Sequence, residues 1–196
     1  MDRAREETAV KTRDLAYIAL FAAIIAVLGT LPAIAVGPVP ITAQTLGVML
    51  AGSILGARRG FLAVLLFLVL VAIGLPLLSS GAGGLAPFAG PSAGYLYSWP
   101  VAAFVIGWLT ERTWSRYGVV RGTLINVLGG IVVIYAVGVP VLTAVTGLAW
   151  DDALWTGAAV FIPGDVVKAV IAAAIADQVR RSYPIIERPR RTAATR

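Results

Sequence analysis

The stretch Leu124–Val145, LINVLGGIVVIYAVGVPVLTAV, decides the fold, because it contains no charged residue along its whole length. A helix needs about 20 mostly apolar residues to cross the hydrocarbon core of a bilayer, so this stretch predicts a transmembrane helix. The composition of the whole chain agrees: 59% of the residues are hydrophobic, 13% are charged, and the mean hydropathy is +0.87. A soluble domain is about half apolar and about a quarter charged, so the sequence predicts an integral membrane protein.

Five more apolar segments lie on either side of this stretch, and together the six predict an all-α integral membrane protein with six transmembrane helices. No long polar linker divides the chain, so we expect a single membrane domain over residues 1–196. Its parts are a cytoplasmic N-terminal segment 1–14, a six-helix bundle over about 15–182 and a basic cytoplasmic tail 183–196. The five other segments are approximately Leu15–Leu31, Ile41–Leu55, Phe61–Leu78, Tyr95–Leu109 and Ala158–Val179.

The basic residues predict the orientation of these segments. Of the 16 Lys and Arg residues, 15 precede the first segment, follow the last, or lie in the connections after the second and the fourth. The positive-inside rule then predicts that both termini lie in the cytoplasm. We expect a multi-pass protein of the plasma membrane. A cleaved secretory signal ending at Ala33-Ile34-Ala35 is an alternative, but the apolar run exceeds the usual core of about 7–15 residues.

Several function classes are excluded by composition. The chain has no Cys and no His, which removes thiol nucleophiles, Ser-His pairs and Cys/His metal sites. The net charge is +6, but the basic residues form no single patch, so we expect the lipid bilayer and no nucleic acid as a partner. No phosphate-binding Gly-x-x-x-x-Gly-Lys motif occurs. We therefore expect no catalytic residue, no metal and no cofactor.

The segment Phe161–Lys168, FIPGDVVK, places a carboxylate and an ammonium group at the start of an apolar helix. Charged side chains are costly in the membrane and mark functional sites by default. Asp165 and Lys168 are spaced i, i+3, so they share one helix face and can pair. The segment therefore predicts a site for a polar substrate. The alternative is a neutralised ion pair that only holds helices together.

Two uncharged polar stretches are predicted to lie at the same membrane face. The connection 75–95 is rich in glycine, and we expect Gly81, Gly83 and Gly84 to offer backbone groups to a ligand and to cover it; an ordinary flexible outer loop is the alternative. In the second stretch, Thr42, Gln44 and Thr45 supply hydrogen-bonding side chains, with interhelical contacts as the alternative.

Small residues recur in the first segment at a spacing that allows close helix contacts. Ala19 and Ala23 form one such pair, and Ala22 and Ala26 form another. The pattern fits packing within the chain as well as contact with a partner subunit.

The combination of motifs resembles the BioY family, the biotin-specific substrate-binding subunits of energy-coupling factor (ECF) transporters. The matching motifs are Pro40-Ile41-Thr42-x-Gln44-Thr45-Leu46, Gly90-Pro91-x-x-Gly94-Tyr95 and Pro163-Gly164-Asp165-x-x-Lys168, and the resemblance covers residues 12–182. Two local departures are Ala82, where family members often have a polar residue, and Ser92-Ala93, where they often have Thr-Gly.

This resemblance implies a non-enzymatic membrane protein that captures biotin and is driven by a coupling membrane subunit and two ATPase subunits. It implies substrate contacts at Asp165 and Lys168, which we extend to Thr42, Gln44 and Tyr95, with the Gly81–Gly84 loop covering the ligand. It also implies that the alanine face of the first segment meets the coupling subunit. The alternatives are a secondary transporter, a binding subunit for another small vitamin, a membrane enzyme and a purely structural subunit.

Overall fold

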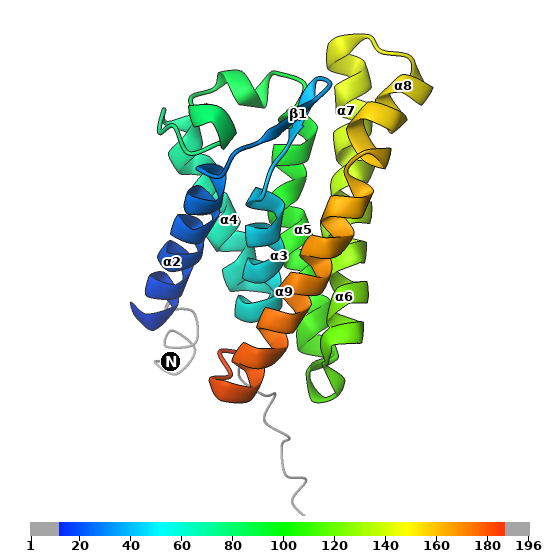
Figure 1. Ribbon diagram of the computed structural model, residues 1–196. Helices are drawn as coiled ribbons and strands as arrows, with labels where there is room; N and C mark the ends of the chain where they lie inside the picture. Colours follow the sequence, from blue (N-terminus) through cyan, green and yellow to red (C-terminus); the bar gives the residue numbers. More distant parts are fainter. Residues whose placement is uncertain (1–11, 187–196) are drawn as a thin grey trace, which may run out of the picture.

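Apolar helices form the body of the structure, a computed structural model that describes residues 12–186 (Figure 1). In chain order, α2, α3 and α4 come before the long connection 73–92. The remaining helices follow that connection. Their bounds are α2 Thr12–Gly29, α3 Gln44–Leu55, α4 Ala57–Ala72, α5 Ala93–Arg112, α6 Val119–Val127, α7 Ile134–Thr146, α8 Trp150–Leu154 and α9 Ile162–Ser182.

Three helical stretches of the described chain are long and apolar enough to cross a membrane. They are Thr12–Gly29 with 18 residues, Val119–Thr146 with 28 and Trp150–Ser182 with 33. The predicted helical, membrane-type architecture is therefore present. The start of α2 and the end of α9 lie at one end of the bundle, and the hairpin, the 73–92 connection and α8 lie at the other (Figure 1).

Helix α3 occupies the centre of the bundle. It packs against α2, α4, α5 and α9, and nearly all of its residues from Gln44 to Leu55 are buried. A helix that is apolar all round is stable only when other helices surround it. The short second segment is therefore the core helix of this fold.

A two-stranded hairpin departs from the all-α prediction. Strand β1 (Ile34–Val36) pairs antiparallel with β2 (Val39–Ile41), and the glycine between them, Gly37, has a φ of +71°. Branched residues on either side of a Gly-Pro turn favour such a ribbon. This hairpin uses Ile41, so α3 begins at Gln44 rather than at the predicted Ile41.

Two other helix ends lie farthest from their predicted positions. Helix α4 ends at Ala72 instead of Leu78, because Gly74 and Pro76 interrupt the apolar run. The last helical stretch begins at Trp150 instead of Ala158. The predicted segments 1–14 and 183–196 lie outside the described residues except for 12–14 and 183–186.

Two wide helical turns interrupt the long helical stretches. The π-helical turn η4 (Leu128–Val133) connects α6 to α7, and the π-helical turn η5 (Trp155–Ala159) precedes α9. Such turns are rare and occur frequently at functional sites. Here each one directly precedes residues of the site described next.

Candidate ligand-binding site

A cavity of about 330 Å³ lies at the hairpin end of the bundle. This volume falls within the range of about 300–1,000 Å³ that is usual for small-molecule sites. Most of its wall is apolar, and a few polar groups converge on it. The wall is formed by β2 and the start of α3, by parts of the connection between Leu78 and Ser92, by Tyr95, Leu96 and Trp99 of α5, by Ile134 and Tyr135 of α7, and by Phe161, Asp165 and Lys168.

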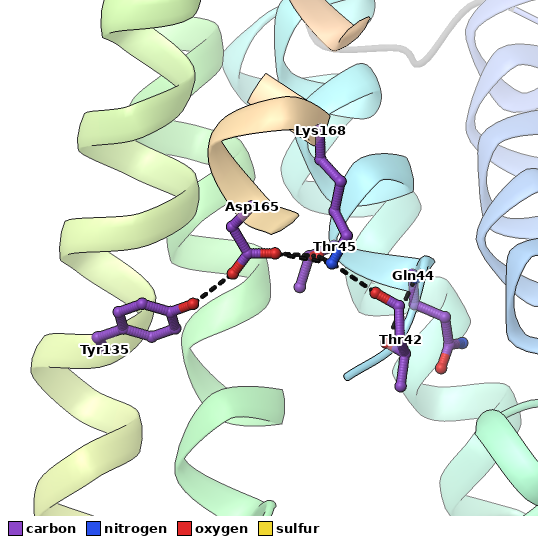
Figure 2. A network of polar contacts seen from close by, with 6 residues as sticks. All are labelled: Thr42, Gln44, Thr45, Tyr135, Asp165 and Lys168. Carbon is purple, nitrogen blue, oxygen red and sulfur yellow. Dashed lines mark hydrogen bonds and ion pairs between the residues drawn. The ribbon is translucent and has the colours of Figure 1, made fainter. Parts of the chain in front are cut away.

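The predicted acid–base pair lies in this wall. Helix α9 starts with Ile162 and has Pro163 in its first turn, where a missing N–H group costs nothing. The i, i+3 spacing then brings Lys168 Nζ to 2.7 Å from Asp165 Oδ1 (Figure 2). The Asp165 side chain is 4% exposed and that of Lys168 is 15% exposed. The two groups therefore form a nearly buried ion pair.

Other helices complete a polar network around the pair (Figure 2). Tyr135 of α7 donates a hydrogen bond to Asp165 Oδ2. Thr45 of α3 donates to Asp165 Oδ1 over 3.3 Å, and Lys168 Nζ donates to Thr45 Oγ1 over 3.1 Å and to the Thr42 carbonyl oxygen over 2.6 Å. These bonds tie α9 to α3, to α7 and to the link between β2 and α3, so the charged groups are held from three sides.

Aromatic rings form the wall beside this network. The Tyr135 ring makes edge contacts with Tyr95 and Phe161, with ring centroids 6.3 Å and 6.4 Å away. The Tyr95 hydroxyl donates to the carbonyl oxygen of Gly157 in η5 over 2.7 Å. Tyr95 thus presents its ring to the cavity, while its polar atom satisfies a buried backbone group.

The structure brings five predicted site residues to the cavity: Asp165, Lys168, Thr42, Gln44 and Tyr95. Thr42 takes part in the network through its backbone carbonyl. The Gln44 side chain points away from the ion pair (Figure 2) and bonds to backbone groups instead. The structure therefore brings residues of all three polar stretches to one cavity. Asp165 and Lys168 form the ion pair, whereas the Gln44 side chain bonds to backbone groups.

The structure does not bring Gly81, Gly83 and Gly84 to the cavity wall. Residues Ser79 and Ala82 of the same connection lie there instead. Gly81 and Gly84 have φ values of +73° and +78°, so their role here is to turn the chain. Gly83 packs on the backbone of Leu75, since a Cβ atom would lie 2.4 Å from the Leu75 oxygen.

The alanine pairs of α2 face in different directions. Ala19 and Ala23 are exposed, whereas Ala22 is buried and Ala26 is half-buried. Packing within the chain therefore accounts for the second pair. The first pair lies on a face that no other described element covers.

Sequence reasoning missed Tyr135 and did not assign Phe161 to the wall. Tyr135 is the one tyrosine in the apolar stretch Leu124–Val145, and a hydroxyl group in such a stretch needs a hydrogen-bond partner. That signal could have marked the residue, although its partner Asp165 is distant in sequence.

Comparison with known proteins identifies the family. The sequence model of the BioY family matches residues 3–185. The chain belongs to the BioY family. The "Biotin transporter BioY" of Rhizobium etli is 54% identical over 184 residues, which cover 90% of this chain and 98% of the relative. The "Biotin transporter BioY" of Rhodobacter capsulatus is 47% identical over 181 residues, which cover 88% and 95%.

The fold of this BioY chain also matches a solved structure. The crystal structure of the S-component for biotin from an ECF-type ABC transporter superposes with a TM-score of 0.83 and 36% sequence identity. The match covers 87% of this chain and 92% of the other. The chain therefore has the fold of a membrane-embedded S-component, and its relatives are named as transporters, not as enzymes.

Proposed function

We propose that this chain binds biotin with high affinity and mediates its uptake as the substrate-binding subunit of an ECF-type ABC transporter. The observation that carries the proposal is the Asp165–Lys168 pair, nearly buried in the wall of a cavity of small-molecule size. Intramembrane charges are expensive and are retained for function. The family and the names of its members supply the substrate class.

The chemistry of the wall suits biotin. Biotin has a polar ureido ring, an apolar thioether body and a carboxylate tail. Asp165 has acceptor capacity beyond its three present bonds, so it can accept a ureido N–H group. Lys168 can exchange its bond to the Thr42 carbonyl for an oxygen of the ligand. Leu96 and Trp99 offer apolar surface to the thioether body.

We further propose six membrane crossings with both ends of the chain in the cytoplasm and the cavity opening toward the outside of the plasma membrane. The distribution of 15 of the 16 basic residues supports this orientation. So does the position of the start of α2 and the end of α9 at the end of the bundle opposite the hairpin (Figure 1). An external solute would then enter from the hairpin side.

The proposed partners are a coupling membrane subunit and two ATPase subunits. The exposed pair Ala19 and Ala23 supports contact of α2 with the coupling subunit, since small residues allow helices to approach closely. Ala23→Trp is expected to leave biotin binding unchanged and to abolish ATP-dependent uptake. The matched variant Leu20→Trp, at another exposed position of α2, is expected to have a smaller effect.

Calorimetric titration of the detergent-purified chain with biotin tests the proposed function directly. We expect saturable one-to-one binding of biotin and no heat with riboflavin as a control vitamin. Folded protein that takes up no biotin would overturn the proposal.

Transport in reconstituted vesicles tests the driving force. We expect uptake to require the coupling and ATPase subunits together with ATP. Uptake by the chain alone that a protonophore abolishes would instead support a secondary transporter, with the buried Asp165–Lys168 pair as its ion-coupling site.

A further inference from the structure

The side chain of Gln44 is 1% exposed and joins three separate parts of the chain. Its Nε2 donates to the carbonyl oxygen of Leu77 over 3.1 Å and to that of Ile25 over 3.3 Å. Its Oε1 accepts a hydrogen bond from the N–H group of Ser79 over 3.2 Å. The amide therefore uses both of its donors and its acceptor on backbone groups of α2 and of the connection after α4.

The bonded part of that connection belongs to the cavity wall. Leu78 lies between the two residues that Gln44 holds, is 8% exposed and lines the cavity together with Ser79 and Ala82. A bond of 3.0 Å from the Leu78 N–H group to the Ala82 carbonyl oxygen closes this segment into a turn. Gln44 thus fixes the position of segment 77–82, which forms one side of the cavity.

Leu77 and the Gln44 side chain also lie in close contact with the end of α2. A Cβ atom at Gly29, the last residue of α2, would lie 2.4 Å from the Leu77 oxygen and 2.8 Å from Gln44 Nε2. Such distances are far below van der Waals contact, so only glycine fits there. The end of α2, the start of α3 and segment 77–82 therefore meet around one buried amide.

We propose that Gln44 is a positioning residue that latches segment 77–82 over the cavity and sets how long a ligand stays bound. This inference rests on the proposed function, since the ligand used to test it is biotin. Because the Gln44 amide is committed to backbone groups and points away from the Asp165–Lys168 pair (Figure 2), it acts through the wall and not through a bond to the ligand.

The first test replaces the amide by an apolar side chain of similar length, Gln44→Met. The unlatched segment opens more often, so we expect the dissociation rate of biotin to rise about tenfold, which corresponds to the loss of one or two net hydrogen bonds. The association rate is expected to change less than about twofold. The same factor is expected for biotin and for its methyl ester, since a latch does not distinguish ligands.

The second test reads the latch without any ligand and uses the absence of cysteine from the chain. A single Leu78→Cys is expected to react with a thiol reagent faster when Gln44→Met is also present. Ala63→Cys, fully buried in α4, is expected to stay unreactive in both backgrounds. Faster labelling at both positions would show general unfolding and would overturn the latch.

A third variant weakens the latch from the other side. Ser79→Pro removes the N–H group that Gln44 Oε1 accepts, at the first position of a short helical turn where proline fits. Relative to Ser79→Ala, which retains this N–H group, biotin dissociation is expected to be about threefold faster.

Ser53→Ala is the matched control for these variants. Ser53 also lies buried on α3 and bonds to another helix, through Asn126 Oδ1 at 2.9 Å, but it lies outside the cavity wall. Its dissociation rate is expected to equal that of the wild type. Unchanged dissociation in Gln44→Met, or a factor that differs between biotin and its ester, would overturn the inference. Wild-type protein that binds no biotin would overturn the proposed function, while the labelling test would still decide the latch.

Discussion

Helix α9 carries two acid–base pairs of the same spacing. Asp165 pairs with Lys168 over 2.7 Å, and Asp177 pairs with Arg180 over 2.9 Å, both at i, i+3. Both carboxylates are nearly buried, with side-chain exposures of 4% and 6%. In the sequence, the two pairs differ in their position along the apolar segment and in their cations, since Asp177 is followed by Arg180 and Arg181.

Their surroundings are different. The hydrogen bonds that Asp177 accepts come from Arg180 and Arg181 of its own helix, and the Arg180 guanidinium lies 6.0 Å from the Trp114 ring. Asp165 instead accepts bonds from α3 and α7 as well, and it lines the cavity. The lesson is that a functional ion pair is identified by the partners and the volume that other elements bring to it.

Neutralising the carboxylate of each pair is expected to give the largest difference in biotin affinity between the two pairs. Asp165→Asn leaves Lys168 in the wall without its counter-charge, and removing one partner of a buried pair costs about 3–5 kcal/mol. We expect biotin affinity to fall by about 100-fold or more. Asp177→Asn is expected to lower the unfolding temperature and to leave affinity within about twofold, as measured by calorimetry and thermal unfolding. Equal losses of affinity would remove the distinction between the two pairs.

Replacing the lysine of one pair by arginine, and the arginine of the other by lysine, is expected to give a smaller difference in biotin affinity. Lys168→Arg keeps the charge, but a planar guanidinium cannot reproduce the three bonds that Nζ makes to Asp165, Thr45 and the Thr42 carbonyl. We expect about tenfold weaker biotin binding, or about 1.4 kcal/mol. Arg180→Lys is expected to affect unfolding alone. An unaltered Kd in Lys168→Arg would show that the charge suffices and that its geometry does not matter.

Removing one tyrosine hydroxyl group beside each pair is expected to give the smallest difference in biotin affinity. Tyr135→Phe keeps the ring contacts with Tyr95 and Phe161 but loses the bond to Asp165 Oδ2. Because this bond orients the carboxylate before the ligand arrives, we expect only about threefold weaker binding, less than the full value of a bond to a charged group. Tyr117→Phe, beside Arg180, serves as the control and is expected to bind normally. A loss in both variants would indicate a general effect of removing buried hydroxyl groups.

The acid–base pair of the site was predictable from the sequence because its geometry is local. Helical spacing alone brings Asp165 and Lys168 together, and the cost of charge in a membrane marks them as functional. Tyr135 was not predictable in the same way. Its hydrogen bond to Asp165 joins α7 to α9 across 30 residues of sequence, and the wide turn η4 directly precedes α7.

The apolar blocks predicted the helices, and departures occur where local chemistry competes with hydropathy. Leu75, Leu77 and Leu78 continue an apolar run, yet Gly74 and Pro76 end the helix there and place Leu78 in the cavity wall. The glycine-rich composition of 75–95 predicted that this connection contributes to the site, and residues of it line the cavity. It did not indicate that Gly81 and Gly84 would turn the chain while Ser79 and Ala82 face the cavity.

The wide turn η5 makes the chain length before α9 adjustable by one residue. Its hydrogen bonds span one residue more than those of a regular α-helical turn. Deleting one residue within 155–159 would therefore convert the turn to a regular one and leave Asp165 facing the cavity. A deletion between Ile162 and Asp165, where the helix is regular, would instead rotate the carboxylate by about 100° relative to the upstream helix. We expect the first deletion to be tolerated and the second to be as damaging as loss of the aspartate itself.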